Sequence, residues 1–205
     1  IIEGWNRRDI AQYLEKENLV SNEEFLEKTK DMEGYLFPDT YRVFLDTTAE
    51  GIIQKMVDNF YKKVNDELFQ EIQKQGKTIE QILTLASIIE AEVRTPEDRK
   101  VVADIFWKRL EVGMPLQSDA TINFLTQSGR SRSNLADLQI DSPYNTYKYK
   151  GLPPGPINNP SLEAILAVVF PTKNSYYYFL TDAEGKVYYA RNFEEHNLNR
   201  AKYLK

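Results

Sequence analysis

Glu90 is the first residue whose type and position could do chemistry. It interrupts an apolar run in the segment ASIIEAEVRTPEDRKVVADIF, residues 86–106. At about 100° of rotation per residue, Glu90 falls inside an apolar helical stripe with Leu83 and Ile79, toward its edge. A carboxyl group on an apolar face holds its proton more tightly, because burial disfavours the charged form. Glu90 is therefore a candidate general acid.

A structural role for Glu90 competes with the catalytic one. The carboxylate could pair with a core arginine, either Arg94 or Arg99, or reach water from the edge of the stripe. Glu92 lies about 160° away around the helix, so the two glutamates cannot act as partners on one face. The residue pattern alone leaves these alternatives open and favours the structural one.

Composition excludes several kinds of site. Among 205 residues there is no cysteine and one histidine, which removes disulfides and thiol nucleophiles and leaves little room for a His-rich zinc site. Acid–base chemistry therefore falls mostly to Asp and Glu, and no metal or organic cofactor is indicated. The net charge of -5 argues against a nucleic-acid partner, which would favour a basic face.

A second candidate region runs from residue 114 to residue 160, where neutral and acidic hydrogen-bonding groups alternate with aromatic rings. Its polar side chains are Gln117, Ser118, Asp119, Thr121, Asn123, Tyr144, Asn145, Tyr147, Asn158 and Asn159. This mixture suits carbohydrate recognition, with hydroxyl partners and flat faces for sugar rings. An ordinary surface loop is the alternative. For His196, a capped surface position is favoured over substrate contact.

Mostly helical elements must position these residues. Caps and apolar periodicity predict helices over 6–17, from Ser21, over 47–76, from Thr78 through Glu90, over 95–111 and over 159–169. A hairpin is predicted from strands 176–181 and 186–191, followed by a short helix. The fold class predicted is α+β, with a helical unit carrying Glu90 packed against a β-rich region that builds the cleft wall.

Several segments resemble a known family. EGYLFPDTY (33–41), LASIIEAE (85–92), DRKVVADIFWKRLEVGMPLQSDATINF (98–124), SPYNTYKYKGLPPGPINNPS (142–161) and YYYFLTDAEGKVYYARNFEEHN (176–197) are similar to the YceG-like (MltG-type) endolytic murein transglycosylases. The resemblance covers nearly the whole chain. Asp98 replaces an expected Glu, and Ala120 replaces a frequent Pro.

The resemblance implies cleavage of peptidoglycan glycan strands at the bond from N-acetylmuramic acid to N-acetylglucosamine, leaving 1,6-anhydro-muramyl ends. It identifies Glu90, the Glu of the A-S-I-x-E motif, as the catalytic residue. One carboxyl group suffices, because the muramyl C6 hydroxyl is the nucleophile. Six residues are expected to bind substrate, with Arg99 supporting Glu90: Gln117, Ser118, Asp119, Tyr144, Asn145 and Tyr147.

The same resemblance implies an organisation and a location. Residues 1–45 are expected to be a partial LysM-like, membrane-proximal subdomain, and residues 46–205 the catalytic domain. The expected partners are peptidoglycan strands, cell-wall synthases and the membrane, reached through an N-terminal helix outside this chain. The expected site of action is the extracytoplasmic face of the cell membrane.

Two other functions compete with the transglycosylase. One is a non-catalytic peptidoglycan-binding or scaffold module, and the other is a muramidase that uses Asp119 as a second carboxylate. Mass analysis of treated glycan strands separates the three, through anhydro ends, reducing ends or no cleavage.

Overall fold

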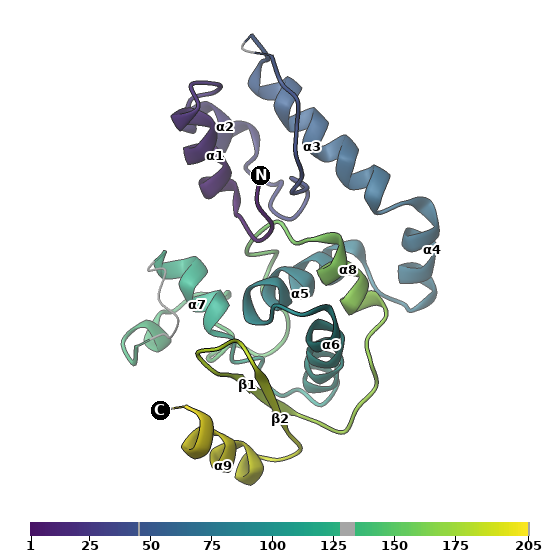
Figure 1. Ribbon diagram of the computed structural model, residues 1–205, viewed down its shortest axis with the longest axis vertical. Coiled ribbons are helices and arrows are strands. Elements are labelled where there is room, and N and C mark those ends of the chain that lie inside the picture. The colour runs from purple at the N-terminus through teal and green to yellow at the C-terminus, as the bar shows by residue number, and fades with distance from the viewer. Residues whose placement is uncertain (45, 128–133, 205) are drawn as a thin grey trace.

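The computed structural model describes residues 1–44, 46–127 and 134–204. Within these residues the chain forms nine α-helices, a short 3-10 helix and one two-stranded sheet. Helices α1, α2 and α3 lie at one end, α5, α6 and α8 in the middle, and the hairpin with α9 at the other end (Figure 1). The chain is thus mixed in class, but in the described part the expected β-rich region is a single hairpin.

The N-terminal unit is built from capped short helices. α1 (Arg7–Lys16) begins with a capping box between Asn6 and Asp9, and α2 (Asn22–Lys28) is capped by Ser21, as the sequence predicts. Their apolar faces form a core with the first half of α3 (Ala49–Lys63). This core extends beyond residue 45, while the boundary predicted there and the LysM-like character of the unit stay predictions.

The long helix predicted over 47–76 is wrong in one respect, because it is two helices. α3 ends at Val64, whose ψ of 80° leaves the helical region. The side chain of Asn65 then accepts a hydrogen bond from the Leu68 amide at 3.1 Å and starts α4 (Asp66–Lys74). The apolar pattern continues across the break, so periodicity alone does not reveal it.

Three helices form the central core. α5 (Ile79–Glu92) is buried without interruption from Ile82 to Ile89, and both α5 and α6 (Pro96–Glu111) pack against α8 (Leu162–Val169). The capping box at Thr78 and the proline at the start of α6 are as predicted. α8 begins later than predicted, because Ser161 is its cap.

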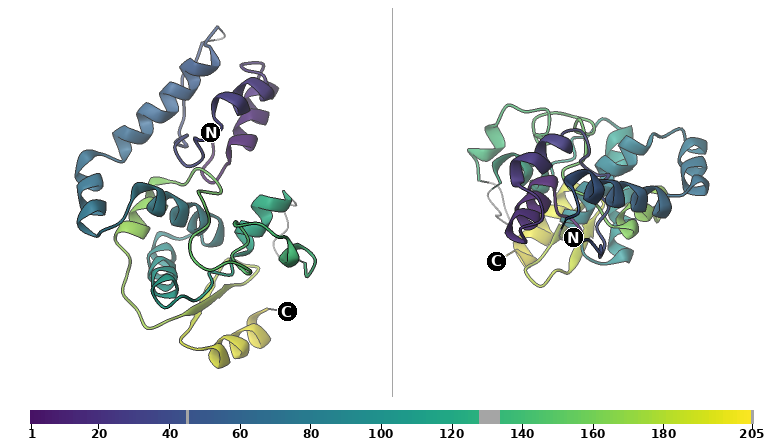
Figure 2. Two further views of the ribbon diagram at one scale, coloured as in Figure 1. Left: turned by 180° about the vertical axis from the view of Figure 1, so that it is seen from behind. Right: turned by 90° about the horizontal axis from the view of Figure 1, so that it is seen from above.

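The polar region 114–160 contains more structure than predicted. α7 (Asp119–Thr126) and the 3-10 helix η1 (Asp137–Gln139) interrupt it. Beyond α8, β1 (Tyr178–Thr181) pairs antiparallel with β2 (Val187–Ala190), and α9 (Phe193–Tyr203) packs on this hairpin. Figure 2 shows α7 and the hairpin on the same side of α5. Among the described helices, none is both long and apolar enough to cross a membrane.

Candidate functional site

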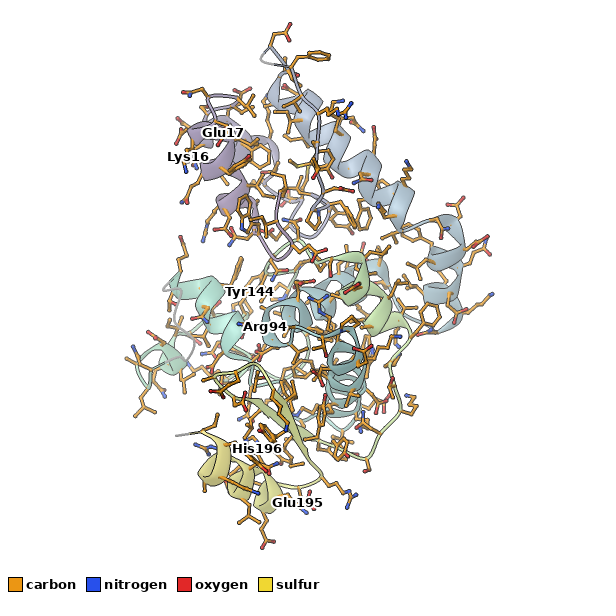
Figure 3. The ribbon with its side chains drawn as sticks, in the orientation of Figure 1. Lys16, Glu17, Arg94, Tyr144, Glu195 and His196 are labelled. Carbon is orange, nitrogen blue, oxygen red and sulfur yellow. The ribbon has the colours of Figure 1, made fainter. Side chains whose placement is uncertain are left out.

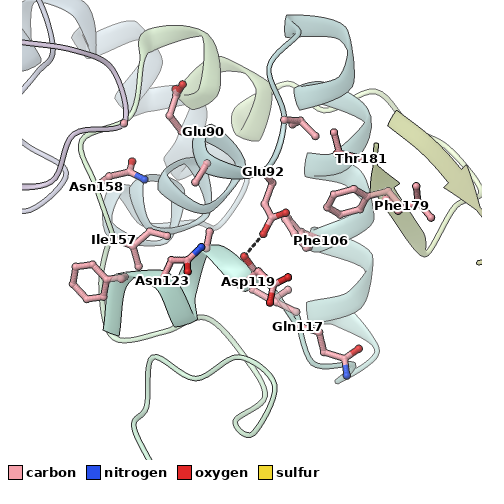
Figure 4. Close-up of a pocket in the computed structure, with 18 of the residues that line it drawn as sticks. Glu90, Glu92, Phe106, Gln117, Asp119, Asn123, Ile157, Asn158, Phe179 and Thr181 are labelled. Carbon is pink, nitrogen blue, oxygen red and sulfur yellow. Dashed lines mark hydrogen bonds between the residues drawn. The ribbon is translucent and has the colours of Figure 1, made fainter. Parts of the chain in front are cut away.

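A cleft of 1220 Å³ lies between the N-terminal unit and the C-terminal elements. Its walls come from α1, the end of α5, α6, α7, the loop between η1 and α8, the hairpin and α9. Figure 4 shows the glutamates of α5 and the polar side chains of α7 around it. Both Glu90 and Glu92 are among the residues that line this space, so the geometry of each must be described separately.

Glu90 is held in a buried ion pair. Its Oε1 accepts a hydrogen bond from Arg99 Nη2 at 2.5 Å, and its Oε2 accepts from the amide of Ser161 at 2.9 Å and from the Ser161 hydroxyl at 2.5 Å. The two charged side chains are only 6% and 7% exposed. The structural alternative raised by the sequence, a pair with a core arginine, is therefore present, and the partner is Arg99.

The N-terminal segment covers Glu90. Gly4 passes close enough that a side-chain Cβ there would lie 3.4 Å from Glu90 Cγ, and its φ of +78° suits glycine. The Gly4 amide donates to the Asn159 carbonyl at 3.0 Å. Glu90 thus points toward the junction between the N-terminal unit and α8.

Glu92 points the other way, toward α7 (Figure 4). It is partly buried, and its Oε1 accepts a hydrogen bond from the hydroxyl of Ser118. The pKa of Glu92 is raised, chiefly because burial disfavours the carboxylate and further because Asp119 is negative nearby. The Ser118 hydroxyl, the Ala120 amide and the charge of Arg109 oppose this shift without reversing it. Glu92 therefore has the environment of an acid that keeps its proton.

Arg109 places a fixed positive charge in the cleft wall near Glu92. The residue is buried, and its Nε and Nη1 donate to the carbonyls of Tyr177 at 2.7 Å and Leu116 at 2.8 Å. Its guanidinium lies 5.1 Å from the centre of the Tyr178 ring. Because its hydrogen bonds go to backbone carbonyls, Arg109 brings positive charge near Glu92 without forming an ion pair with it.

Four of the six residues predicted to bind substrate line the cleft: Gln117, Ser118, Asp119 and Tyr147. Gln117 adopts a left-handed φ of 53° immediately before α7. Tyr147 donates its hydroxyl to Asp119 Oδ1 at 3.1 Å, and burial followed by the Asp119 charge raises the Tyr147 pKa. The carboxylate of Asp119 is thereby oriented beside Glu92.

The other two predicted residues, Tyr144 and Asn145, are not among the described residues that line the cleft. Asn145 is fully buried, and its Nδ2 donates to the carbonyls of Leu138 at 3.0 Å and Ile140 at 2.8 Å. Tyr144 packs against Phe124 with ring centres 5.0 Å apart. Both positions support the loop that carries Tyr147.

The sequence reasoning did not consider Glu92 as an acid, and it favoured a surface position for His196. His196 lines the cleft beside Tyr178, with ring centres 5.3 Å apart, and burial lowers its pKa. The sequence did contain one signal for Glu92, because helix geometry places it on the face of α5 opposite Glu90, where it can meet different neighbours. Among the described residues, no group of three or more His, Asp or Glu side chains is arranged to hold a metal ion.

Comparisons with known proteins agree on one family. The YceG-like family matches residues 1–202. The chain is 41% identical over 181 residues to an endolytic murein transglycosylase of Streptococcus pneumoniae serotype 2 (strain D39), covering 84% of this chain and 32% of that protein. It is 39% identical over 187 residues to an endolytic murein transglycosylase of Bacillus subtilis (strain 168), covering 90% and 52%.

The fold is also that of a solved relative. The crystal structure of a yceG-like protein from Listeria monocytogenes matches with a TM-score of 0.90 and 34% identity, over 97% of this chain and 74% of that one. The chain spans about a third of the length of the pneumococcal relative and about half of that from Bacillus. The chain belongs to the YceG-like family.

Proposed function

We propose that this chain carries the catalytic cleft of a peptidoglycan lytic transglycosylase, with Glu92 as the acid. The observation that carries the proposal is the contrast between two neighbouring glutamates. Glu92 faces the cleft with a raised pKa, whereas both oxygens of Glu90 are engaged by Arg99 and Ser161. The names of the relatives, endolytic murein transglycosylase, supply the substrate class.

The proposed reaction needs one carboxyl group. Protonated Glu92 donates its proton to the glycosidic oxygen as the bond from the muramyl C1 to that oxygen breaks. The resulting Glu92 carboxylate takes the proton from the muramyl C6 hydroxyl while the C6 oxygen forms its bond to C1. The products are a free 4-hydroxyl on one strand end and a 1,6-anhydro ring on the other, and Glu92 ends protonated, as it began.

Glu90 remains the competing acid, since the A-S-I-x-E motif predicts it. To donate a proton to substrate, Glu90 would have to give up the contacts of both its oxygens, to Arg99 and to Ser161. We propose instead that Glu90 fixes the last turn of α5, which ends at Glu92.

A muramidase is the second candidate, and the position of Asp119 favours it. Asp119 is close enough to Glu92 to raise its pKa, so the cleft does hold two neighbouring carboxyl groups. In a muramidase, Asp119 would activate water or form a covalent intermediate. The hydrogen bond that Asp119 accepts from Tyr147 occupies one of its oxygens and orients it.

The test is mass analysis of glycan strands treated with the wild-type protein, Glu92→Gln and Glu90→Gln. We expect anhydro ends from the wild type, a loss of at least about 100-fold in rate for Glu92→Gln, and a smaller loss for Glu90→Gln. Retained activity in Glu92→Gln together with inactive, folded Glu90→Gln would return the acid to Glu90. Reducing ends would favour the muramidase, and no cleavage by the wild type would favour a binding module.

The wider role extends the same proposal. Trimming or termination of strands in cell-wall synthesis, cell-wall synthases as partners and action at the outer face of the cell membrane all rest on the family relationship. Copurification of the protein with a synthase and its recovery in membrane fractions are the corresponding measurements.

A further inference from the structure

The acidic side chains of the cleft all have hydrogen-bond donors, whereas its arginines differ in whether they have partners. Its carboxyl groups all have hydrogen-bond donors: Asp9 accepts from the Asn6 amide, Glu90 from Arg99, Glu92 from Ser118, Asp119 from Tyr147 and Asp182 from the Lys186 amide. The arginines in the lining differ from one another. Arg109 donates to backbone carbonyls, and Arg200 reaches Asn197 at 3.5 Å.

Arg94 and Arg8 have no such partner. Within the part of the chain that the structure describes, neither guanidinium forms a hydrogen bond or an ion pair, although both line the cleft. Arg94 is exposed and Arg8 is partly exposed. Cations in the cleft wall that form neither kind of pair leave positive charge available to a ligand.

Arg94 is placed beside the proposed acid. It follows Glu92 by two residues, in the connection between α5 and α6, and its Nη1 lies 3.5 Å from where a Cβ of Gly185 would be. It therefore rests against the turn of the hairpin, on the exposed side of the connection, near the middle of the view in Figure 3. Arg8 enters the same cleft from the first turn of α1, in the N-terminal unit.

We propose that Arg94, assisted by Arg8, forms a carboxylate-binding subsite that recognises acidic groups on the glycan strand. This inference rests on the proposed function and adds a substrate preference to it. Guanidinium groups match carboxylates geometrically through paired N–H donors. A peptidoglycan strand carries carboxylates on its stem peptides, and also on the muramyl lactyl group once the stem has been removed. Bare neutral glycan offers neither.

The experiment compares wild type and Arg94→Gln on three preparations of one strand pool. The first carries intact stem peptides, the second has its carboxyl groups converted to amides, and the third has its stems removed by an amidase, which frees the lactyl carboxylate. Cleavage rate and the affinity of fluorescent strands are both measured. Arg42→Gln is the matched control, because Arg42 is exposed and lines a separate groove.

We expect Arg94→Gln to weaken binding of intact strands about tenfold and to have no effect on amidated strands, with Arg8→Gln giving a smaller loss of the same kind. A loss confined to intact strands identifies the stem carboxylates as the ligand, and a loss on stem-free strands as well shows that the subsite also accepts the freed lactyl carboxylate. An unchanged affinity of Arg94→Gln for intact strands, or an equal loss on amidated strands, would overturn the subsite.

The affinity for glycan strands also allows the carboxylate subsite to be tested separately from the proposed transglycosylase activity. If the wild type bound strands without cleaving them, the transglycosylase proposal would be wrong. The affinities of Arg94→Gln would still test the carboxylate subsite. If strands were cleaved and Arg94→Gln matched the wild type throughout, the subsite alone would fail.

Discussion

Glu90 and Glu92 show how little a helical face says about the protonation of a single residue. α5 is buried over eight consecutive residues, so no narrow apolar stripe distinguishes one glutamate from the other. The difference lies in what surrounds each carboxyl group. Glu90 has a cation and an amide as donors, whereas Glu92 has a hydroxyl, an amide and a nearby negative charge.

Glu33 provides a titration whose direction can be worked out. Burial raises its pKa to about 7, although the Arg7 amide and guanidinium pull the other way. Between the unfolded value near 4.5 and the folded value of about 7, the folded state binds more protons than the unfolded one. Stability therefore falls as pH rises through this window, by up to about 3 kcal/mol.

We expect Glu33→Gln to reduce that slope, because an amide does not ionise. Urea denaturation at pH 5 and pH 8 should give the wild type a larger loss of unfolding free energy at pH 8 than the variant, whose remaining slope comes from other groups such as Glu92. Glu27→Gln, an exposed glutamate of α2, should keep the wild-type slope. Equal slopes for Glu33→Gln and the wild type would contradict the assignment.

At the scale of elements, Arg99 joins three helices at one point. From α6 it reaches Glu90 of α5, the Ser161 cap of α8 at 3.0 Å, and Glu163 at 3.5 Å. Its Nε also donates to the Val93 carbonyl at 3.3 Å, directly after α5. The end of α5, and with it the direction of Glu92, is thus fixed by helices distant in sequence.

Arg99→Met should destabilise the protein by about 3–5 kcal/mol, because it leaves the Glu90 carboxylate buried without its cation. Chemical denaturation measures this. Glu163→Gln is the control, since that side chain is 63% exposed and an exposed pair contributes at most about 1 kcal/mol. Adding Glu90→Gln to Arg99→Met should recover part of the loss. If Arg99→Met lost no more unfolding free energy than Glu163→Gln, Arg99 would not be the residue that holds the three helices together.

The elements that could be predicted are those with local signals. Caps at Asn6, Ser21, Thr78 and Thr95 fix the starts of four helices in the sequence itself. α7 could not be predicted in this way, because its N-cap residue, Ser118, makes no capping hydrogen bond. The Ser118 hydroxyl donates to Glu92 instead, so a long-range contact replaces the local capping bond.

The site was predictable in type more than in detail. Of the residues that the polar composition indicated, Gln117, Ser118, Asp119 and Tyr147 line the cleft, while their contact with substrate stays a prediction. Composition could not separate Asn145, whose amide bonds backbone carbonyls inside its own loop, because residue type does not reveal whether a side chain is already satisfied. For the same reason, the sequence could not decide whether Glu90 pairs with Arg94, pairs with Arg99 or reaches water.

At the scale of the whole molecule, Asn159 ties the N-terminal unit to the central helical core. It is fully buried, and its Oδ1 accepts from the amides of Gly34 at 2.8 Å and Leu36 at 2.9 Å. Its Nδ2 donates to the Trp5 carbonyl at 3.0 Å and to Glu33 Oε1 at 2.9 Å. One side chain thus joins two segments of the N-terminal unit, at Trp5 and at 33–36, to the segment that precedes α8.

Asn159→Ala should cost about 3 kcal/mol or more, because it leaves several buried donors and acceptors unpaired. Denaturation should show a larger loss than for its neighbour Asn158→Ala, whose amide makes a single hydrogen bond, to the Ser87 carbonyl. Limited proteolysis should cut the N-terminal helices faster in Asn159→Ala. Equal losses for the two variants would show that the tie is not specific to Asn159.

The hydrogen bond from Asn159 to Trp5 spans 154 positions of sequence. Contacts between such distant residues require a large loop to close first, which slows their formation. During synthesis, Asn159 must leave the ribosome before Trp5 and its neighbours can settle over Glu90. The segment around Gly4 and Trp5 therefore reaches its place only after 154 further residues have been added, and this wall of the cleft forms late relative to its own synthesis.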